Sequence, residues 1–138
     1  MKSELNIKWL ENMAFESEIN GHKIIVDADP KFGGENKGPR PKPFVLLAMA
    51  GCTGMDVISL FKKFRLNIKD LNIRVVGDMT EEHPIQFTKM HVIYEIKGID
   101  LDARLIEKAV RLSQEKYCGV IATYKKGIEV SYEIDIKS

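Results

Sequence analysis

The chain has 138 residues, a net charge of +1, and acidic and basic residues that are mixed along its length. This length predicts one domain, spanning residues 1–138, that can bury a core without disulfide or metal staples. The charge pattern shows neither a basic patch for nucleic acid nor an acidic disordered block. The N-terminus lacks the apolar core of a signal peptide, and the longest apolar run, Phe44 to Cys52, falls short of the roughly 20 residues that span a bilayer. We therefore expect a soluble cytoplasmic protein without nucleic-acid or membrane partners.

The first quarter of the chain predicts an antiparallel meander of three strands. Residues 5–10 and 14–19 alternate between apolar and polar side chains, which is the period of a strand. Asn20-Gly21 then predicts a tight hairpin, because both residues tolerate the positive φ of a type I′ turn. Residues 22–27 return as the third strand.

Residues 28–43 form a connection rich in glycine and proline that shows no periodicity. A loop of this length inside a compact domain is uncommon and is often functional or mobile. A plain flexible crossover is equally consistent with the composition, so the sequence leaves both interpretations open.

Residues 44–65 predict a helix, and this is the most apolar segment of the chain. Apolar residues surround its first half on all sides, which predicts burial rather than a one-sided amphipathic helix. Gly51 and Gly54 flank Cys52, and each glycine lowers helix stability by roughly 1 kcal/mol relative to alanine. They indicate either close approach of a backbone or ligand, or ordinary tight helix packing.

The second half of the chain predicts a hairpin, helices and a last strand. Residues 70–79 and 86–97 read as strands, residues 101–116 as an amphipathic helix, and residues 127–136 as the final strand. A break at Tyr117-Cys118-Gly119 and a short helical segment precede that strand. One row of the second strand is expected to face inward, and its members are Met90, Val92, Tyr94 and Ile96. The class is α+β with mostly antiparallel strands.

The two cysteines, Cys52 and Cys118, are the candidate reactive residues. Neither a GxSxG nucleophile elbow nor a phosphate-binding glycine loop is present. The cysteines form no CxxC motif, and no histidine lies at zinc-ligand spacing, so we expect no metal and no cofactor. Cys52 can be a small buried hydrophobic residue or a nucleophile that a second thiol resolves. Asp56 lies one turn beyond Cys52 and is expected to bond a loop amide.

The stretches GPRPKPFVLLAMAGCTGMDV and YCGVIATYKKGIEV together resemble the OsmC/Ohr family of osmotically inducible and organic hydroperoxide resistance proteins. The chain is most similar to the YhfA-like branch, with GGENxGPxP before the helix and GCTxxDV within it. The resemblance covers nearly the whole chain. It implies an intertwined homodimer of two-layer α+β subunits, with buried central helices and active sites at the subunit interface.

The resemblance also implies a thiol peroxidase that reduces organic hydroperoxides. In that scheme Cys52 matches the peroxidatic cysteine and Cys118 the resolving one. A dithiol reductant, such as a lipoylated protein, would regenerate the enzyme. No cofactor is implied.

The sequence departs from the peroxidase branches at the residues that activate the thiol. Those branches place a Glu after the helix-leading proline, paired with an Arg from the meander, whereas this chain has Lys42 or Pro43 at the Glu position. The first meander turn reads Glu11-Asn12-Met13, without an arginine, and Gly119 replaces the usual proline after the second cysteine.

Arg40 or Lys42 is available as a replacement cation, and Glu35 as an acid. Two functions therefore remain open. One is a cysteine-based hydroperoxide reductase. The other is a non-catalytic protein that binds a small apolar ligand or senses redox state.

Overall fold

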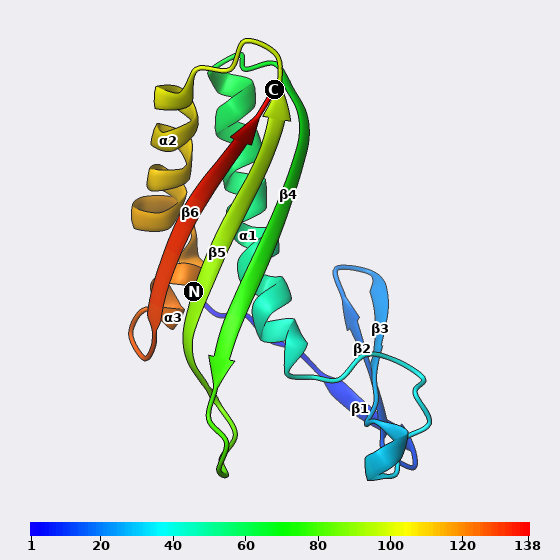
Figure 1. Ribbon diagram of the computed structural model, residues 1–138. Coiled ribbons are helices and arrows are strands. Elements are labelled where there is room, and N and C mark those ends of the chain that lie inside the picture. Colours follow the sequence, from blue (N-terminus) through cyan, green and yellow to red (C-terminus); the bar gives the residue numbers. More distant parts are fainter. The chain divides into compact units, whose positions relative to one another are not determined.

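The structure is a computed structural model that describes all residues from Met1 to Ser138. Its internal contacts divide the chain into two compact units, Met1–Val45 and Leu46–Ser138, which are described in turn. The elements of both units are labelled in Figure 1. Strands and helices are both present in the order that the sequence predicts, which confirms the α+β class.

The first unit contains the predicted antiparallel meander. Its strands are β1 (Ile7–Glu11), β2 (Ala14–Ile19) and β3 (His22–Val26), in the spatial order β1-β2-β3. Asn20 and Gly21 have φ values of 52° and 82°, as a type I′ hairpin turn requires. One sheet face keeps its apolar side chains exposed within this unit, and Trp9 is 60% exposed.

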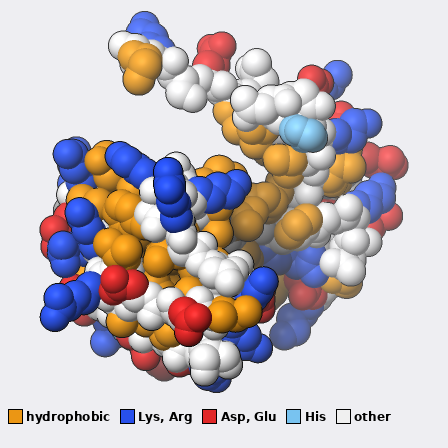
Figure 2. Space-filling model, turned by 90° about the horizontal axis from the view of Figure 1, so that it is seen from above, with side chains coloured by type: hydrophobic (Ala, Val, Ile, Leu, Met, Phe, Trp, Pro, Cys, Tyr) orange, Lys and Arg blue, Asp and Glu red, His pale blue; other side chains and the backbone are white.

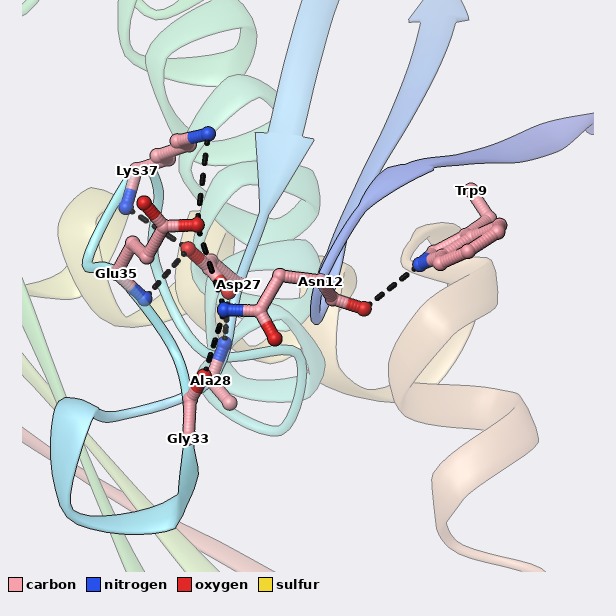
Figure 3. A network of polar contacts seen from close by, with 7 residues as sticks. All are labelled: Trp9, Asn12, Asp27, Ala28, Gly33, Glu35 and Lys37. Atoms are coloured by element: carbon pink, nitrogen blue, oxygen red, sulfur yellow. Dashed lines mark hydrogen bonds and ion pairs between the residues drawn. The ribbon is translucent and has the colours of Figure 1, made fainter.

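The connection after β3 is ordered by a single buried carboxylate. Asp27 is 3% exposed and accepts hydrogen bonds from the backbone amides of Ala28, Glu35 and Lys37 at 2.7, 3.1 and 3.1 Å (Figure 3). The hydrogen bond from the Lys37 amide makes the largest contribution to lowering the pKa of Asp27. A short 3₁₀ turn, η1 (Pro30–Phe32), lies within this segment. These hydrogen bonds give the loop a defined conformation.

The second unit packs helices against a three-stranded sheet. Its strands are β4 (Ile68–Met79), β5 (Phe87–Gly98) and β6 (Glu129–Lys137), in the order β4-β5-β6. β4 and β5 are antiparallel, whereas β5 and β6 are parallel. A parallel neighbour requires a long crossover, and α2 (Ala103–Leu112), η2 (Ser113–Tyr117) and α3 (Gly119–Tyr124) supply it.

The long helix α1 (Pro43–Lys63) begins in the first unit and runs along the sheet of the second. It lies with α2 on one face of β4-β5-β6 (Figure 1). The helix buries one stripe, at Met49, Thr53, Val57 and Phe61. The predicted inward row of β5 is confirmed, since Met90, Val92, Tyr94 and Ile96 are at most 1% exposed. A Cβ at Gly54 would lie 3.1 Å from Cδ1 of Ile73, so this glycine serves tight helix–sheet packing.

For a single chain, the prediction that the first half of α1 is buried on all sides is wrong. Leu47 is 62% exposed and Met55 is 76% exposed, and other hydrophobic side chains also reach the surface between charged ones (Figure 2). The physical reason is that the second unit offers one sheet, which covers one side of the helix. By length and composition alone, α1 would also be able to cross a bilayer, although core helices of soluble proteins pass the same test.

Candidate active site

The fold brings the two cysteines together with a carboxylate. Cys52 and Asp56 come from the middle of α1, and Cys118 comes from the junction between η2 and α3. The two Sγ atoms and a carboxylate oxygen of Asp56 all lie within 4.8 Å of one another. Asp56 shares a helix face with Cys52 because the two residues are four positions apart.

A π-helical turn places Cys118 at this site. The predicted helix over 101–116 ends as an α-helix at Leu112 and continues as the π-turn η2. The turn closes with a 2.9 Å hydrogen bond from the amide of Cys118 to the carbonyl oxygen of Ser113. Cys118 then caps α3, where its Sγ accepts the amide hydrogen of Ile121 at 3.4 Å. Such π-turns within helices are frequent at functional sites.

The Cys118 thiol is buried, whereas Cys52 is half-buried. Cys118 is only 3% exposed, and the amide of Ile121 in α3 lies against its sulfur. Burial raises the pKa of Cys118 to about 11, and interaction with the neighbouring Cys52 thiol contributes to the increase. Cys118 is therefore a protonated thiol near neutral pH.

A buried polar network reaches the site from the core. Ser113 donates a hydrogen bond to Oδ2 of Asp56 at 2.9 Å, and its hydroxyl is 2.6 Å from that of Thr53. The Thr53 hydroxyl is in turn 2.7 Å from the phenol oxygen of Tyr94, which accepts a hydrogen bond from Nε2 of Gln114 at 2.9 Å. The prediction that Asp56 bonds a loop amide is corrected, because its partner is the Ser113 hydroxyl.

Gln114 ends this network inside the protein. The residue is 4% exposed, and its Oε1 is a buried side-chain oxygen without a hydrogen-bond partner. Its backbone carbonyl accepts a hydrogen bond from Nζ of Lys125 at 3.0 Å. Sequence reasoning missed Thr53, Ser113 and Gln114 as site residues. The only available signal was the placement of polar residues at expected core positions of two helices.

The same three groups have to be weighed as a metal site, because two sulfurs and a carboxylate are ligands that zinc accepts. Zinc would bind the cysteines as thiolates, while burial holds the pKa of Cys118 at about 11. One oxygen of Asp56 also accepts the Ser113 hydrogen bond. The expectation that no metal binds at these three residues stays a prediction.

The residues considered as replacement activators belong to the first unit. Glu35 accepts a 3.3 Å hydrogen bond from Nδ2 of Asn12, the residue in the turn where the peroxidase branches supply arginine. Glu35 also lies 3.7 Å from Nζ of Lys37 (Figure 3). Arg40 lies 3.7 Å from Asp29. This acid therefore pairs with a side-chain amide of the meander turn.

Three comparisons place these features among known proteins. Residues 34–133 match the family described as OsmC-like protein. Protein YhfA of Escherichia coli (strain K12) is 31% identical over 134 residues, covering 96% of this chain and 97% of that protein. Both matched segments of this chain include Cys52 and Cys118.

Solved structures share the fold. A hypothetical protein from Aquifex aeolicus VF5 is 29% identical with a TM-score of 0.81, and the match covers 100% of both chains. The organic hydroperoxide resistance protein OhrB of Bacillus subtilis is 15% identical, with a TM-score of 0.60, covering 99% of this chain and 98% of that one. At that identity the second likeness shows the fold alone.

Proposed function

This chain belongs to the OsmC-like protein family, and from that premise we propose that it is a thiol peroxidase that reduces organic hydroperoxides. Cys52 is the nucleophile and Cys118 the resolving thiol. The observation that carries the proposal is the approach of the two sulfurs to within 4.8 Å. A disulfide between them requires the sulfurs to approach further, to about 2.0 Å.

The chemistry divides into two steps that the positions of the thiols support. The Cys52 thiolate attacks the O–O bond of the hydroperoxide, which yields an alcohol and a sulfenic acid on Cys52. The Cys118 thiol then attacks that sulfur, so that a disulfide forms and water leaves. A dithiol reductant returns both cysteines to thiols. Cys52 takes the first step because it is the more accessible thiol, while Cys118 is buried behind it.

Partners and location are parts of the same proposal. The exposed apolar residues of α1 and of the meander, including Leu47, Met55 and Trp9, support a homodimer that covers them. A dithiol such as a lipoylated protein suits a disulfide enclosed between two helical elements. A reducing cytoplasm would keep both thiols in their active form.

Peroxide consumption by four variants tests the proposal. Wild type, Cys52→Ser, Cys118→Ser and the double variant are mixed with tert-butyl hydroperoxide and dihydrolipoamide in a stopped-flow instrument. Wild type should turn over, Cys52→Ser should be inactive, and Cys118→Ser should stop after forming a sulfenic acid. Turnover of wild type no faster than the double variant would sink the proposal.

Mass spectrometry of the oxidised protein separates this function from the alternative of a protein that only binds an apolar ligand. A protein that only binds an apolar ligand should retain two free thiols after one equivalent of hydroperoxide. The peroxidase should instead contain one intramolecular bond between Cys52 and Cys118.

A further inference from the structure

In the hydrogen-bond network that ends at Asp56, each group donates toward the carboxylate. Gln114 donates to Tyr94, and Ser113 donates to Asp56. Because the Ser113 hydrogen is used, its oxygen accepts the hydrogen of Thr53. The Thr53 oxygen then accepts from Tyr94. The chain of donors therefore runs from the core and ends on Oδ2 of Asp56.

The position of Asp56 gives this chain a chemical use. Its carboxylate lies within 4.8 Å of both sulfurs, a separation that a thiol hydrogen bond or one water molecule bridges. Ser113 occupies Oδ2 and fixes the orientation of the group. The other carboxylate oxygen is left to interact with the thiols.

We propose that Asp56 is the proton acceptor for the resolving thiol, and that Thr53, Tyr94 and Gln114 hold it in place through Ser113. The inference rests on the proposed function. As Cys118 attacks the sulfenic sulfur of Cys52, its proton passes to Asp56 while the S–S bond forms and the S–O bond breaks. Asp56 then gives the proton to the departing hydroxide, which leaves as water. The sum is one thiol and one sulfenic acid converted to one disulfide and one water.

The buried thiol explains why a base is needed. Burial raises the pKa of Cys118 to about 11, so only about one thiol in ten thousand is ionised at pH 7. Resolution by the free thiolate would be correspondingly slow. The pKa of Tyr94 is raised by burial as well, which keeps its phenol protonated as a donor. The other titratable groups near the site are Cys52, Tyr124, Lys125 and Tyr132.

The test separates formation of the sulfenic acid from its resolution. Asp56→Asn keeps the shape of the side chain and removes its basicity, and Asp78→Asn on β4 is the charge-matched control, since Asp78 pairs with Lys89 at the surface. tert-Butyl hydroperoxide is added to each reduced protein. Dimedone traps the sulfenic acid, and thiol counting follows the disulfide.

We expect Asp56→Asn still to form sulfenic acid on Cys52 but to convert it to the disulfide about 100-fold more slowly than wild type. Its dimedone adduct should accumulate accordingly. The resolution rate of this variant should rise about tenfold per pH unit from about pH 6 to about pH 9, because only the Cys118 thiolate reacts, whereas the wild-type rate should depend less on pH. Asp78→Asn should match wild type in every measurement.

An unchanged rate of disulfide formation in Asp56→Asn would overturn the inference. Formation of neither a sulfenic acid nor a disulfide in wild type would instead refute the proposed function, so the two failures are distinct. If Asp56→Asn does not fold, Ser113→Ala decides the question, because it keeps the carboxylate and removes its orienting bond. A resolution rate at least about fivefold lower with a steeper pH dependence supports the inference, and an unchanged rate contradicts it.

Discussion

Replacing Thr53 with valine tests whether the buried network stabilises the fold. Thr53 is fully buried, and its hydroxyl lies 2.7 Å from Tyr94 and 2.6 Å from Ser113. Valine has nearly the same shape but can neither donate nor accept. The substitution therefore leaves the Tyr94 phenol as a buried donor without an acceptor, and Ser113 loses a donor to its oxygen.

The expected loss follows from three contributions. A buried donor without a partner costs about 1–3 kcal/mol, and the second hydrogen bond contributes about 1 kcal/mol. The additional methyl group returns about 0.8 kcal/mol of apolar burial. The free energy of unfolding should consequently fall by about 2 kcal/mol.

Urea unfolding at one fixed protein concentration measures this change. Thr88→Val is the control, because Thr88 is exposed and its hydroxyl makes only a 3.3 Å contact with the carbonyl oxygen of Asp78. It should change the free energy of unfolding by less than about 0.5 kcal/mol. A double-mutant cycle with Tyr94→Phe should give a coupling energy of about 1–2 kcal/mol, since the second change removes the unpaired phenol. A Thr53→Val protein as stable as the control, or a strictly additive cycle, would refute the reasoning.

Two further predictions concern pH, with opposite signs. The pKa of Cys118 rises from 9.0 to about 11 on folding, so between these values the folded chain keeps a proton that the unfolded chain has released. The free energy of unfolding should therefore fall as the pH rises over that range. The difference between wild type and Cys118→Ser in urea unfolding isolates this dependence on pH. The pKa of Asp27 is lowered from 3.8 by backbone hydrogen bonds, so its contribution should be present above that pH and disappear as the pH falls below it. Asp27→Asn should lack this pH-dependent contribution to the free energy of unfolding. It should also expose the loop after β3 to protease at neutral pH. A loop as resistant to protease as that of wild type would contradict the ordering role of Asp27.

Periodicity was sufficient to predict most elements of the fold. The inward row of β5 around Tyr94 and the hairpin at Asn20-Gly21 follow from local pattern and turn chemistry, and both are confirmed. The parallel pairing of β5 with β6 has no local signal, because it depends on the length and packing of the crossover. The exposed side of α1 was missed for a related reason: hydrophobicity predicts that a surface is covered but does not say by which chain.

Only part of the candidate site could be predicted from the sequence. The two cysteines were identified from their sequence contexts, and their approach depends on the π-turn at Ser113–Tyr117. A π-turn inserts one residue into a helical period, so the pattern over 101–116 still looks like a plain amphipathic helix. Ser113 and Gln114 continue the buried stripe of Ile106, Ala109 and Val110, so the helical period itself turns them inward.

The long crossover between β5 and β6 also bears on how the chain matures. Cys118 lies inside this crossover, and Cys52 lies on a helix that packs against the same sheet. The sulfurs approach each other only when both segments have docked, which requires contacts between residues far apart in sequence, and such contacts form slowly. A newly made chain therefore has no proximity between its thiols until α1 and the crossover have both docked. Reactivity of the pair becomes a marker of completed folding.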